Sequence, residues 1–300
     1  MEGPKPRFGV IAVVGKPNVG KSTLVNVIVG QKVSIVSDKP QTTRRSVMGI
    51  ANGDGYQMCL VDTPGIHEAH NRLGREMLDS ARAAVADVDA ILYVADASHH
   101  PGAGDQRIAK LLKQVAPETP LVLALNKMDL LKADRVMPHV EAYCGLLGTE
   151  EYMLTTATRE LNVAKLAAML VERLPEGEPQ YPVDDFTNQS SRYMAAEIVR
   201  ERILSATRDE VPYATAVQIT DWEDGETITR IHAEILVEKS SQRAILLGKG
   251  GRTIKEIGSS ARLEIEALLG SQIFLELHVK VEEGWRMNPA ILRELEYRES

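Results

Sequence analysis

Residues 15–22, which read GKPNVGKS, constrain the fold of this chain more than any other stretch. They match the pattern G-x-x-x-x-G-K-[ST], in which a glycine-rich loop joins a strand to a helix and surrounds phosphate groups. The apolar run at 8–14 has the length of a strand, and the run at 23–29 can begin a helix. Backbone N–H groups of such a loop and the positive end of the helix dipole favour a bound anion.

The side chains of this loop predict a nucleotide phosphate site with a metal ion. Lys21 can reach the β- and γ-phosphates, and the Ser22 hydroxyl can bind Mg²⁺. The alternative is a glycine turn with a chance lysine, which the flanking strand and helix disfavour. The residues predicted to contact the phosphates are Gly15, Lys16, Pro17, Asn18, Val19, Gly20, Lys21, Ser22 and Thr23.

A second motif, Asp62-Thr63-Pro64-Gly65, follows a strand predicted at 56–61. It stands at the carboxyl end of that strand, where open α/β sheets bind ligands. We expect Asp62 to hold Mg²⁺ directly or through water, and the Gly65 N–H to meet the γ-phosphate. A simple turn is the alternative, which the preceding phosphate loop makes less attractive.

The third motif, Asn126-Lys127-Met128-Asp129, follows the apolar strand predicted at 121–125. The Asp129 carboxylate can accept hydrogen bonds from N1–H and the 2-amino group of guanine, whereas adenine offers neither donor and leaves a charge unpaired. Lys127 can lie over the purine, Asn126 can brace neighbouring loops, and a solvated helix start is the alternative. We expect the backbone N–H groups of Thr156 and Ala157 to read guanine O6, so the predicted ligand is GTP or GDP.

Hydrolysis of GTP needs an aligned water and neutralised phosphate charge. Thr42 and Thr43 lie in a polar segment without periodicity. One of them is expected to contact Mg²⁺ and the γ-phosphate in the GTP state and to lose this contact after hydrolysis. The residue after the second motif is Ile66, which cannot orient a water, so intrinsic turnover should be slow. The predicted catalytic group is therefore Lys21, Thr42, Thr43 and Gly65.

The length of 300 residues suggests roughly two domains. We expect an α/β domain at 1–175 with a doubly wound, mostly parallel sheet, a proline- and acid-rich linker at 176–190, and a smaller α+β domain at 191–300. No apolar run approaches the ~18 residues that span a bilayer, and the polar N-terminus does not resemble a signal peptide. These features predict a cytoplasmic protein, which we expect to be a monomer.

The second domain carries a G-x-x-G loop, Gly248 to Gly251, between an apolar helix end and a new helix. Such a loop lets a backbone approach single-stranded RNA, and the basic residues around it reverse the overall net charge of −7 locally. A helix cap is the alternative to an RNA-binding loop. The new helix carries an apolar stripe that consists of Ile254, Ile257, Ala261, Ile265 and Leu268. In this stripe, Ile254 and Ile257 can be either core or groove wall. The predicted RNA contacts are Gly248, Lys249, Gly250, Gly251, Arg252, Ile254, Lys255 and Ile257.

A GTPase domain followed by a KH domain, with these motifs, resembles the bacterial Era GTPases over nearly the whole chain. The likeness rests on GKPNVGKS, PQTTRR, DTPGI, NKMD, LLGKGGRTIKEIG and VKVEEGWR. It implies a role in assembly of the small ribosomal subunit, with binding near the 3′ end of 16S rRNA favoured in the GTP state. It also implies loose association with the cytoplasmic face of the membrane, although the sequence shows no amphipathic anchor.

The chain departs from the family pattern at Lys249-Gly250, which leaves the glycine pair of the G-x-x-G loop intact, and at Thr156. Thr156 stands where the family commonly has serine, which leaves backbone contacts intact. In potassium-stimulated relatives an asparagine at the place of Asn18 binds K⁺, so here Asn18 either binds K⁺ or only shapes the loop. A rival interpretation of the whole chain is a GTP hydrolase whose C-terminal domain serves only packing or oligomerisation.

Overall fold

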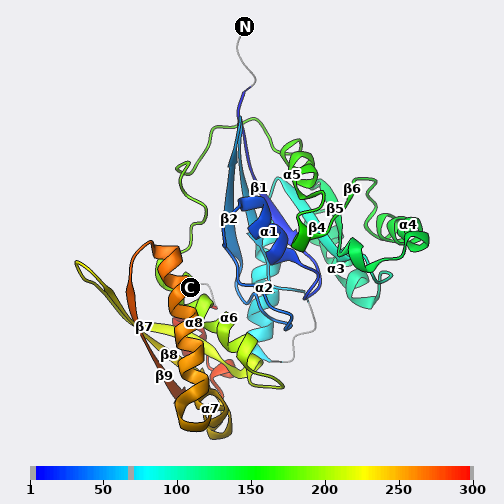
Figure 1. Ribbon diagram of the computed structural model, residues 1–300. Helices are drawn as coiled ribbons and strands as arrows, with labels where there is room; N and C mark the ends of the chain where they lie inside the picture. The colour runs from blue at the N-terminus through cyan, green and yellow to red at the C-terminus, as the bar shows by residue number, and fades with distance from the viewer. Residues whose placement is uncertain (1–4, 67–70, 298–300) are drawn as a thin grey trace. The chain divides into compact units, whose positions relative to one another are not determined.

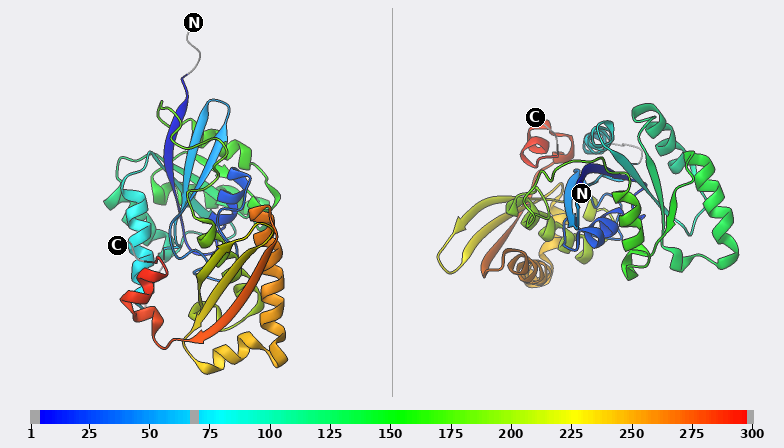
Figure 2. Two further views of the ribbon diagram at one scale, coloured as in Figure 1. Left: turned by 90° about the vertical axis from the view of Figure 1, so that its left-hand side faces the viewer. Right: turned by 90° about the horizontal axis from the view of Figure 1, so that it is seen from above.

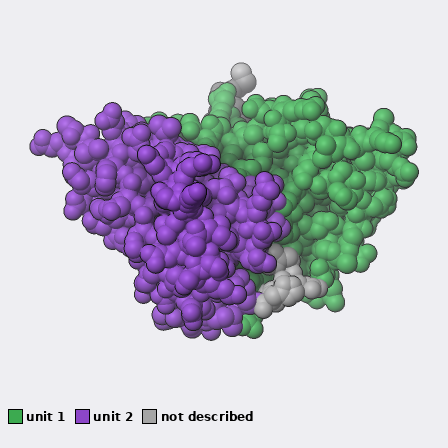
Figure 3. All heavy atoms as spheres, turned by 60° about the horizontal axis from the view of Figure 1, so that its bottom comes forward, with its two compact units in different colours: residues 1–36, 43–69, 74–188 green, residues 37–42, 70–73, 189–300 purple. Residues whose placement is uncertain are grey.

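The computed structural model describes residues 5–66 and 71–297. They fall into two compact units, which Figure 3 draws in different colours. The short segment around residue 40 belongs to the same unit as the C-terminal region, although it lies early in the sequence. Among the described helices, none has both the length and the apolar character needed to cross a membrane. The first unit comprises residues 1–36, 43–69 and 74–188, and the second comprises 37–42, 70–73 and 189–300.

The first unit is built on a six-stranded sheet with the order β2-β3-β1-β4-β5-β6 (Figure 1). Every pair of neighbours is parallel except β2 and β3, which form an antiparallel hairpin. The predicted mostly parallel sheet is therefore confirmed. The strands are β1 Arg7–Val14, β2 Val47–Gly53, β3 Tyr56–Asp62, β4 Ala90–Asp96, β5 Leu121–Asn126 and β6 Tyr152–Leu154.

Helices cover both faces of this sheet because its central strands are apolar on both sides. In β1, Ile11 and Val13 join a cluster with residues of α1 and α5, whereas Ala12 and Val14 join a cluster with residues of α2, α3 and α4. The helices are α1 Lys21–Val29, α2 Arg72–Ala86, α3 Ala103–Val115, α4 Val136–Leu147 and α5 Val163–Val171.

The predicted linker lies along the β2 and β3 side of the first unit. The buried Gln57 amide donates to the Tyr181 carbonyl at 2.8 Å and accepts from the Tyr181 N–H at 2.9 Å. The Ile50 N–H donates to the Phe186 carbonyl at 2.9 Å, and the Thr187 hydroxyl to the Met48 carbonyl at 2.6 Å. The segment is thus fixed to the first unit by hydrogen bonds to its backbone and side chains.

The second unit contains a three-stranded sheet with the order β7-β8-β9, in which β7 and β8 are antiparallel and β8 and β9 parallel. Ile231 and Ile235 of β8 form one apolar cluster with Ile198 of α6 and Ile265 of α8. Figure 2 shows α8 running beside this sheet. The elements are α6 Ser191–Ala206, β7 Ala216–Asp224, β8 Thr229–Val237, α7 Ser240–Leu247, α8 Arg252–Leu269, β9 Ile273–Val281 and α9 Pro289–Glu294.

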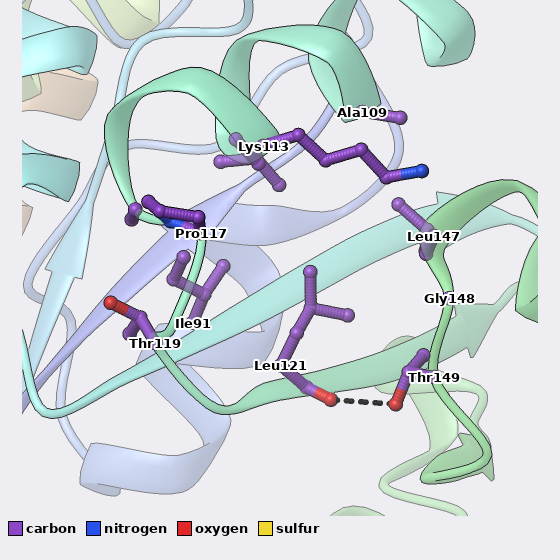
Figure 4. Close-up of a pocket in the computed structure, with 11 residues that line it drawn as sticks. Ile91, Ala109, Lys113, Pro117, Thr119, Leu121, Leu147, Gly148 and Thr149 are labelled. Atoms are coloured by element: carbon purple, nitrogen blue, oxygen red, sulfur yellow. Dashed lines mark hydrogen bonds between the residues drawn. The ribbon is translucent and has the colours of Figure 1, made fainter.

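A pocket of the first unit lies at the edge of the sheet where β4 and β5 begin (Figure 4). Ile91 and Leu121 line it, and the Thr149 hydroxyl donates to the Leu121 carbonyl at 2.9 Å. The three nucleotide motifs follow the opposite, carboxyl ends of the parallel strands. The pocket contains none of the predicted site residues.

Candidate functional site

The phosphate loop and the second motif meet because β1 and β3 are parallel neighbours. The Ile66 N–H donates to the Gly15 carbonyl at 3.3 Å. A Cβ added to Gly65 would lie 2.8 Å from the Pro17 backbone, so only glycine permits this close approach. The structure thus brings together the two motifs expected to surround the γ-phosphate.

Asn126, at the end of β5, connects the phosphate loop to the loop after β6. Its Nδ2 donates to the Val19 carbonyl at 2.9 Å, and its Oδ1 accepts from the Ala157 N–H at 3.0 Å. A Cβ on Gly20 would collide with the Asn126 side chain. The Thr156 N–H also donates within the protein, to the Leu161 carbonyl at 3.2 Å. For these two N–H groups to bind guanine O6, each must share its present hydrogen bond or exchange it for one to the base.

Lys21 and Asp62 are buried charges at the centre of this site. The Lys21 ammonium donates to the Gly15 carbonyl at 3.2 Å and to the Lys16 carbonyl at 3.0 Å. Burial lowers the pKa of Lys21 to about 8 against the opposing effect of Asp62, and burial raises the pKa of Asp62 against the effects of Lys21 and Ser22. A phosphate beside Lys21 and a cation beside Asp62 would stabilise both charged forms.

The oxygen atoms around Asp62 fit a magnesium ion. Asp62 Oδ2 accepts the Ser22 hydroxyl at 2.6 Å, and the Thr43 hydroxyl lies 3.0 Å from Ser22 Oγ. Asp62 Oδ1 is buried without a hydrogen-bond partner among the described residues. Mg²⁺ binds through few protein oxygens and completes its shell with phosphates and water. Among the described residues, no group of three histidine, cysteine or acidic side chains could hold a metal ion.

The structure distinguishes the two candidate threonines. The Thr43 hydroxyl is 3.4 Å from Asp62 Oδ2, next to Ser22. The Thr42 hydroxyl instead donates to the Lys39 carbonyl at 2.6 Å. Of the two, it is therefore Thr43 that is positioned with the other oxygen ligands.

The guanine motif follows β5 as a short 3₁₀ helix, Met128–Leu130. The Lys127 ammonium is held by the Asp96 carboxylate at 2.9 Å, at the end of the neighbouring strand β4. The Asp129 carboxylate lies 3.6 Å from the Arg159 guanidinium, and its side chain is 22% exposed. One carboxylate oxygen of Asp129 thus has a cationic neighbour, while the side chain remains accessible to a ligand.

Ile66, which follows the second motif, offers no polar side chain that could orient the attacking water. Ile66 is 9% exposed and packs into the apolar cluster with α2, α3 and α4. Asn18 is exposed and has a positive φ of 61°, a conformation that asparagine tolerates better than most residues. This backbone conformation fits the loop-shaping interpretation of Asn18.

The G-x-x-G loop of the second unit presents its backbone to solvent. Gly250 has φ 63°, and a Cβ built there meets nothing within 4 Å. Lys249 and Lys255 are exposed and form no ion pair within the described chain, whereas Arg252 pairs with Glu256 at 3.3 Å. Open backbone beside unpaired ammonium groups is the arrangement that phosphate binding requires.

One of the predicted RNA contacts needs correction. Ile257 is 2% exposed and belongs to the apolar core, so its side chain cannot line a groove. The helical stripe places it inward, while Ile254 is half-buried. Ile245, an apolar residue of α7 just before the loop, is 52% exposed and was not among the predicted contacts. The sequence signal for Ile245 was an apolar residue on the otherwise hydrophilic side of the short helix before the loop.

Known proteins match the chain over both units. A family model for 50S ribosome-binding GTPases matches residues 10–127, and a model for the KH domain matches residues 210–286. The GTPase Era of Heliobacterium modesticaldum is 43% identical over 298 residues, which is 98% of each chain.

Solved structures agree. A point variant of Aquifex aeolicus Era bound to GDP·AlF₄⁻ is 37% identical, with a TM-score of 0.92 over 98% of this chain and all of that one. Era in complex with MgGDPNP and nucleotides 1506–1542 of 16S ribosomal RNA is also 37% identical, with a TM-score of 0.93 and the same coverage. This agreement confirms the predicted resemblance and the predicted enzyme class: the chain belongs to the Era family of GTPases.

Proposed function

We propose that the nucleotide state of this GTPase controls its affinity for the 3′-terminal region of 16S ribosomal RNA. By this means the protein assists assembly of the small ribosomal subunit. The observation that carries the proposal is the exposed loop at 248–251, in a chain similar throughout to an Era that holds this RNA and MgGDPNP together. Glycine backbone and unpaired lysines suit a single-stranded RNA backbone. Gly248, Lys249, Gly250, Gly251, Arg252, Ile254 and Lys255 remain the proposed contacts, with Ile245 added.

The proposed coupling is supported by the second unit, which includes residues 37–42. Within it, the fully buried Arg200 guanidinium donates to the Thr42 carbonyl and is held by Glu197 at 2.6 and 2.7 Å. The next residue, Thr43, belongs to the first unit and lies beside Ser22. A change at the γ-phosphate that moves Thr43 would therefore also displace the adjoining segment 37–42, which belongs to the RNA-binding unit.

In the proposed mechanism, Ser22, Thr43 and Asp62 hold Mg²⁺, which neutralises phosphate charge when bound. The Lys21 ammonium has three donors, so it keeps its hydrogen bonds to the Gly15 and Lys16 carbonyls and directs the third to phosphate oxygens. The Gly65 N–H donates to the γ-phosphate. Ile66 provides no water-orienting group, so alignment of the water falls to backbone groups, to K⁺ at Asn18 or to a bound partner. Intrinsic turnover should then lie well below the enzyme median of ~10 s⁻¹.

Titration of a 16S 3′-end RNA fragment tests this function. Bound to a non-hydrolysable GTP analogue, the protein should bind the fragment about tenfold more tightly than when bound to GDP, within the usual range of coupling energies. Thr43→Val removes the oxygen beside Ser22 and should abolish most of this difference while slowing hydrolysis at least about tenfold. Fluorescence anisotropy and phosphate release measure the two effects.

Thr42→Val is the matched control, because it removes a hydroxyl that donates to the Lys39 carbonyl and leaves the Thr42 carbonyl in place. Its effect should be clearly smaller than that of Thr43→Val. Equal RNA affinity in both nucleotide states of the unmodified protein would refute the coupling and leave two independent modules. Failure to bind RNA in either state would favour a C-terminal unit that serves only packing or oligomerisation.

The proposed potassium role predicts faster hydrolysis in K⁺ than in Na⁺. A cation at Asn18 would supply positive charge at the phosphates, and Na⁺ is too small to take the same ligands at their ideal distances. Phosphate release at constant ionic strength should fall several-fold on exchange of K⁺ for Na⁺, and Asn18→Ala should remove this dependence. The same rate in both salts would leave Asn18 with loop shaping alone.

We also propose domain bounds, a cellular location and an oligomeric state. We place the GTPase domain at 1–175, the linker at 176–190 and the KH domain at 191–300. We further propose a cytoplasmic monomer that associates peripherally with the membrane surface and acts on the small subunit. Sedimentation and cell fractionation, with and without ribosomal subunits, test these assignments together.

A further inference from the structure

The ammonium group of Lys16, the second residue of the phosphate loop, is bound within the protein. Its Nζ lies 2.7 Å from Oδ2 of Asp105, a residue of α3 that is 89 positions away in the sequence. The Asp105 side chain is 1% exposed and the Lys16 side chain 28% exposed. An ion pair with this little exposure is a fixed tether, because breaking it would strand a buried carboxylate.

The other polar contacts of the Asp105 carboxylate hold it in place. Oδ2 also accepts from the Gly102 N–H at 2.8 Å, at the N-terminus of α3, where the helix dipole favours negative charge. Oδ1 accepts from the Tyr93 hydroxyl of β4 at 2.9 Å. Burial and the neighbouring carboxylate raise the pKa of Tyr93, so that its hydroxyl stays a donor.

The backbone of α3 makes room for the tether. A Cβ on Gly104 would lie 2.9 Å from Lys16 Cδ, so a larger residue would push the lysine stem away. Asp105, Gly102 and Gly104 thus form a receptor for the Lys16 side chain at the first turn of the helix.

The ion pair between Lys16 and Asp105 affects the phosphate site through the backbone of Lys16. The Lys16 carbonyl accepts from the Lys21 ammonium at 3.0 Å, so the position of residue 16 sets the position of the lysine that faces the phosphates. We propose that Asp105 is a positioning residue for GTP binding and hydrolysis, which fixes the phosphate loop through Lys16. Lys16 then contributes its backbone to the nucleotide site, while its side chain serves as the anchor.

A second ion pair from the same β4–α3 region supports this role. Asp96, at the end of β4, holds Lys127 of the guanine motif at 2.9 Å. The two carboxylates Asp96 and Asp105 therefore anchor one lysine of the guanine motif and one lysine of the phosphate loop. The segment between β4 and α3 acts as a common frame for the base and the phosphates.

The test is a double-mutant cycle of Asp105→Asn and Lys16→Gln. Each single change should raise the dissociation constants of GDP and GTP about tenfold and should also lower kcat, because Lys21 loses its reference position. The double variant should be much less than additive, since both changes remove the same tether. Lys16→Arg keeps a cation opposite Asp105 and should therefore recover part of the affinity and kcat that Lys16→Gln loses.

Asp89→Asn is the matched control, because Asp89 also uses a carboxylate oxygen inside the first unit, accepting the Val10 N–H at 2.7 Å far from the motifs. It should lower the melting temperature without changing kcat or nucleotide affinity. If Asp105→Asn likewise changes only the melting temperature, or if the two effects simply add, the positioning role is wrong. Nucleotide affinity, kcat and the melting temperature are all measured without RNA, so failure here is distinguishable from failure of the proposed RNA binding.

Discussion

Replacement of Asp129 by asparagine should weaken GDP and GTP binding by roughly 100-fold or more and should create affinity for xanthosine nucleotides. In the proposed guanine site the carboxylate accepts two hydrogen bonds from the base, and each bond to a charged group contributes about 1.5–3 kcal/mol. Asparagine keeps one acceptor but points an N–H₂ group at the 2-amino group of guanine. Xanthine carries an oxygen at that position, which accepts from the amide.

Calorimetric titration with GDP and xanthosine diphosphate measures both effects. Asp134→Asn is a suitable control, since Asp134 is a largely exposed aspartate shortly after the motif, with a surface ion pair to Arg135 at 3.7 Å. That variant should bind GDP like the unmodified protein. Undiminished GDP affinity in Asp129→Asn would refute the assignment of the guanine-reading carboxylate.

The nucleotide motifs were predictable because each combines local conformation with chemistry. The loop at 15–22 needs only its own glycines and the flanking strand and helix, and the guanine motif needs only a strand that ends at Asn126. Parallel strands then bring these ends together without further information. The same logic predicted the sheet, since buried parallel strands are continuous apolar runs.

The residues that hold these motifs in place were not predictable in the same way. Asp105 reaches Lys16 across 89 positions, and no local pattern links a first-turn aspartate to a distant lysine. The choice of Thr43 over Thr42 depends on how an irregular segment is threaded beside Ser22. Three helices, α2, α4 and α9, were also not predicted. Pro138 lies in the first turn of α4, which tolerates proline, although proline usually argues against a helix.

The stripe on α8 shows the limit of helical periodicity. Spacing alone correctly groups Ile257, Ala261 and Ile265 on the buried face, but it cannot say whether that face meets a core or a nucleic acid. Packing against β8 decides the matter for Ile257. Apolar residues that contact RNA must instead remain accessible, as Ile245 does.

Substitution of Gly250 by aspartate should reduce affinity for the 16S 3′-end fragment by at least about tenfold while leaving GTP hydrolysis intact. A Cβ at this position meets no neighbour within 4 Å, so the new side chain would project into the space open to RNA. It would place a negative charge between Lys249 and the approaching phosphate, which offsets roughly one of the favourable phosphate contacts. Anisotropy titrations at two salt concentrations should also show a shallower salt dependence.

Backbone strain must be separated from this electrostatic effect, because Gly250 has φ 63° and aspartate tolerates this region at a modest cost. Gly270, at the end of α8, provides the control: its φ is 66°, it is exposed, and a Cβ there also meets nothing within 4 Å. Gly270→Asp should lower the melting temperature about as much as Gly250→Asp but should keep RNA affinity. Equal RNA affinity in all three proteins would exclude the loop at 248–251 from the RNA interface, whereas a loss confined to Gly250→Asp would assign the effect to charge at that loop.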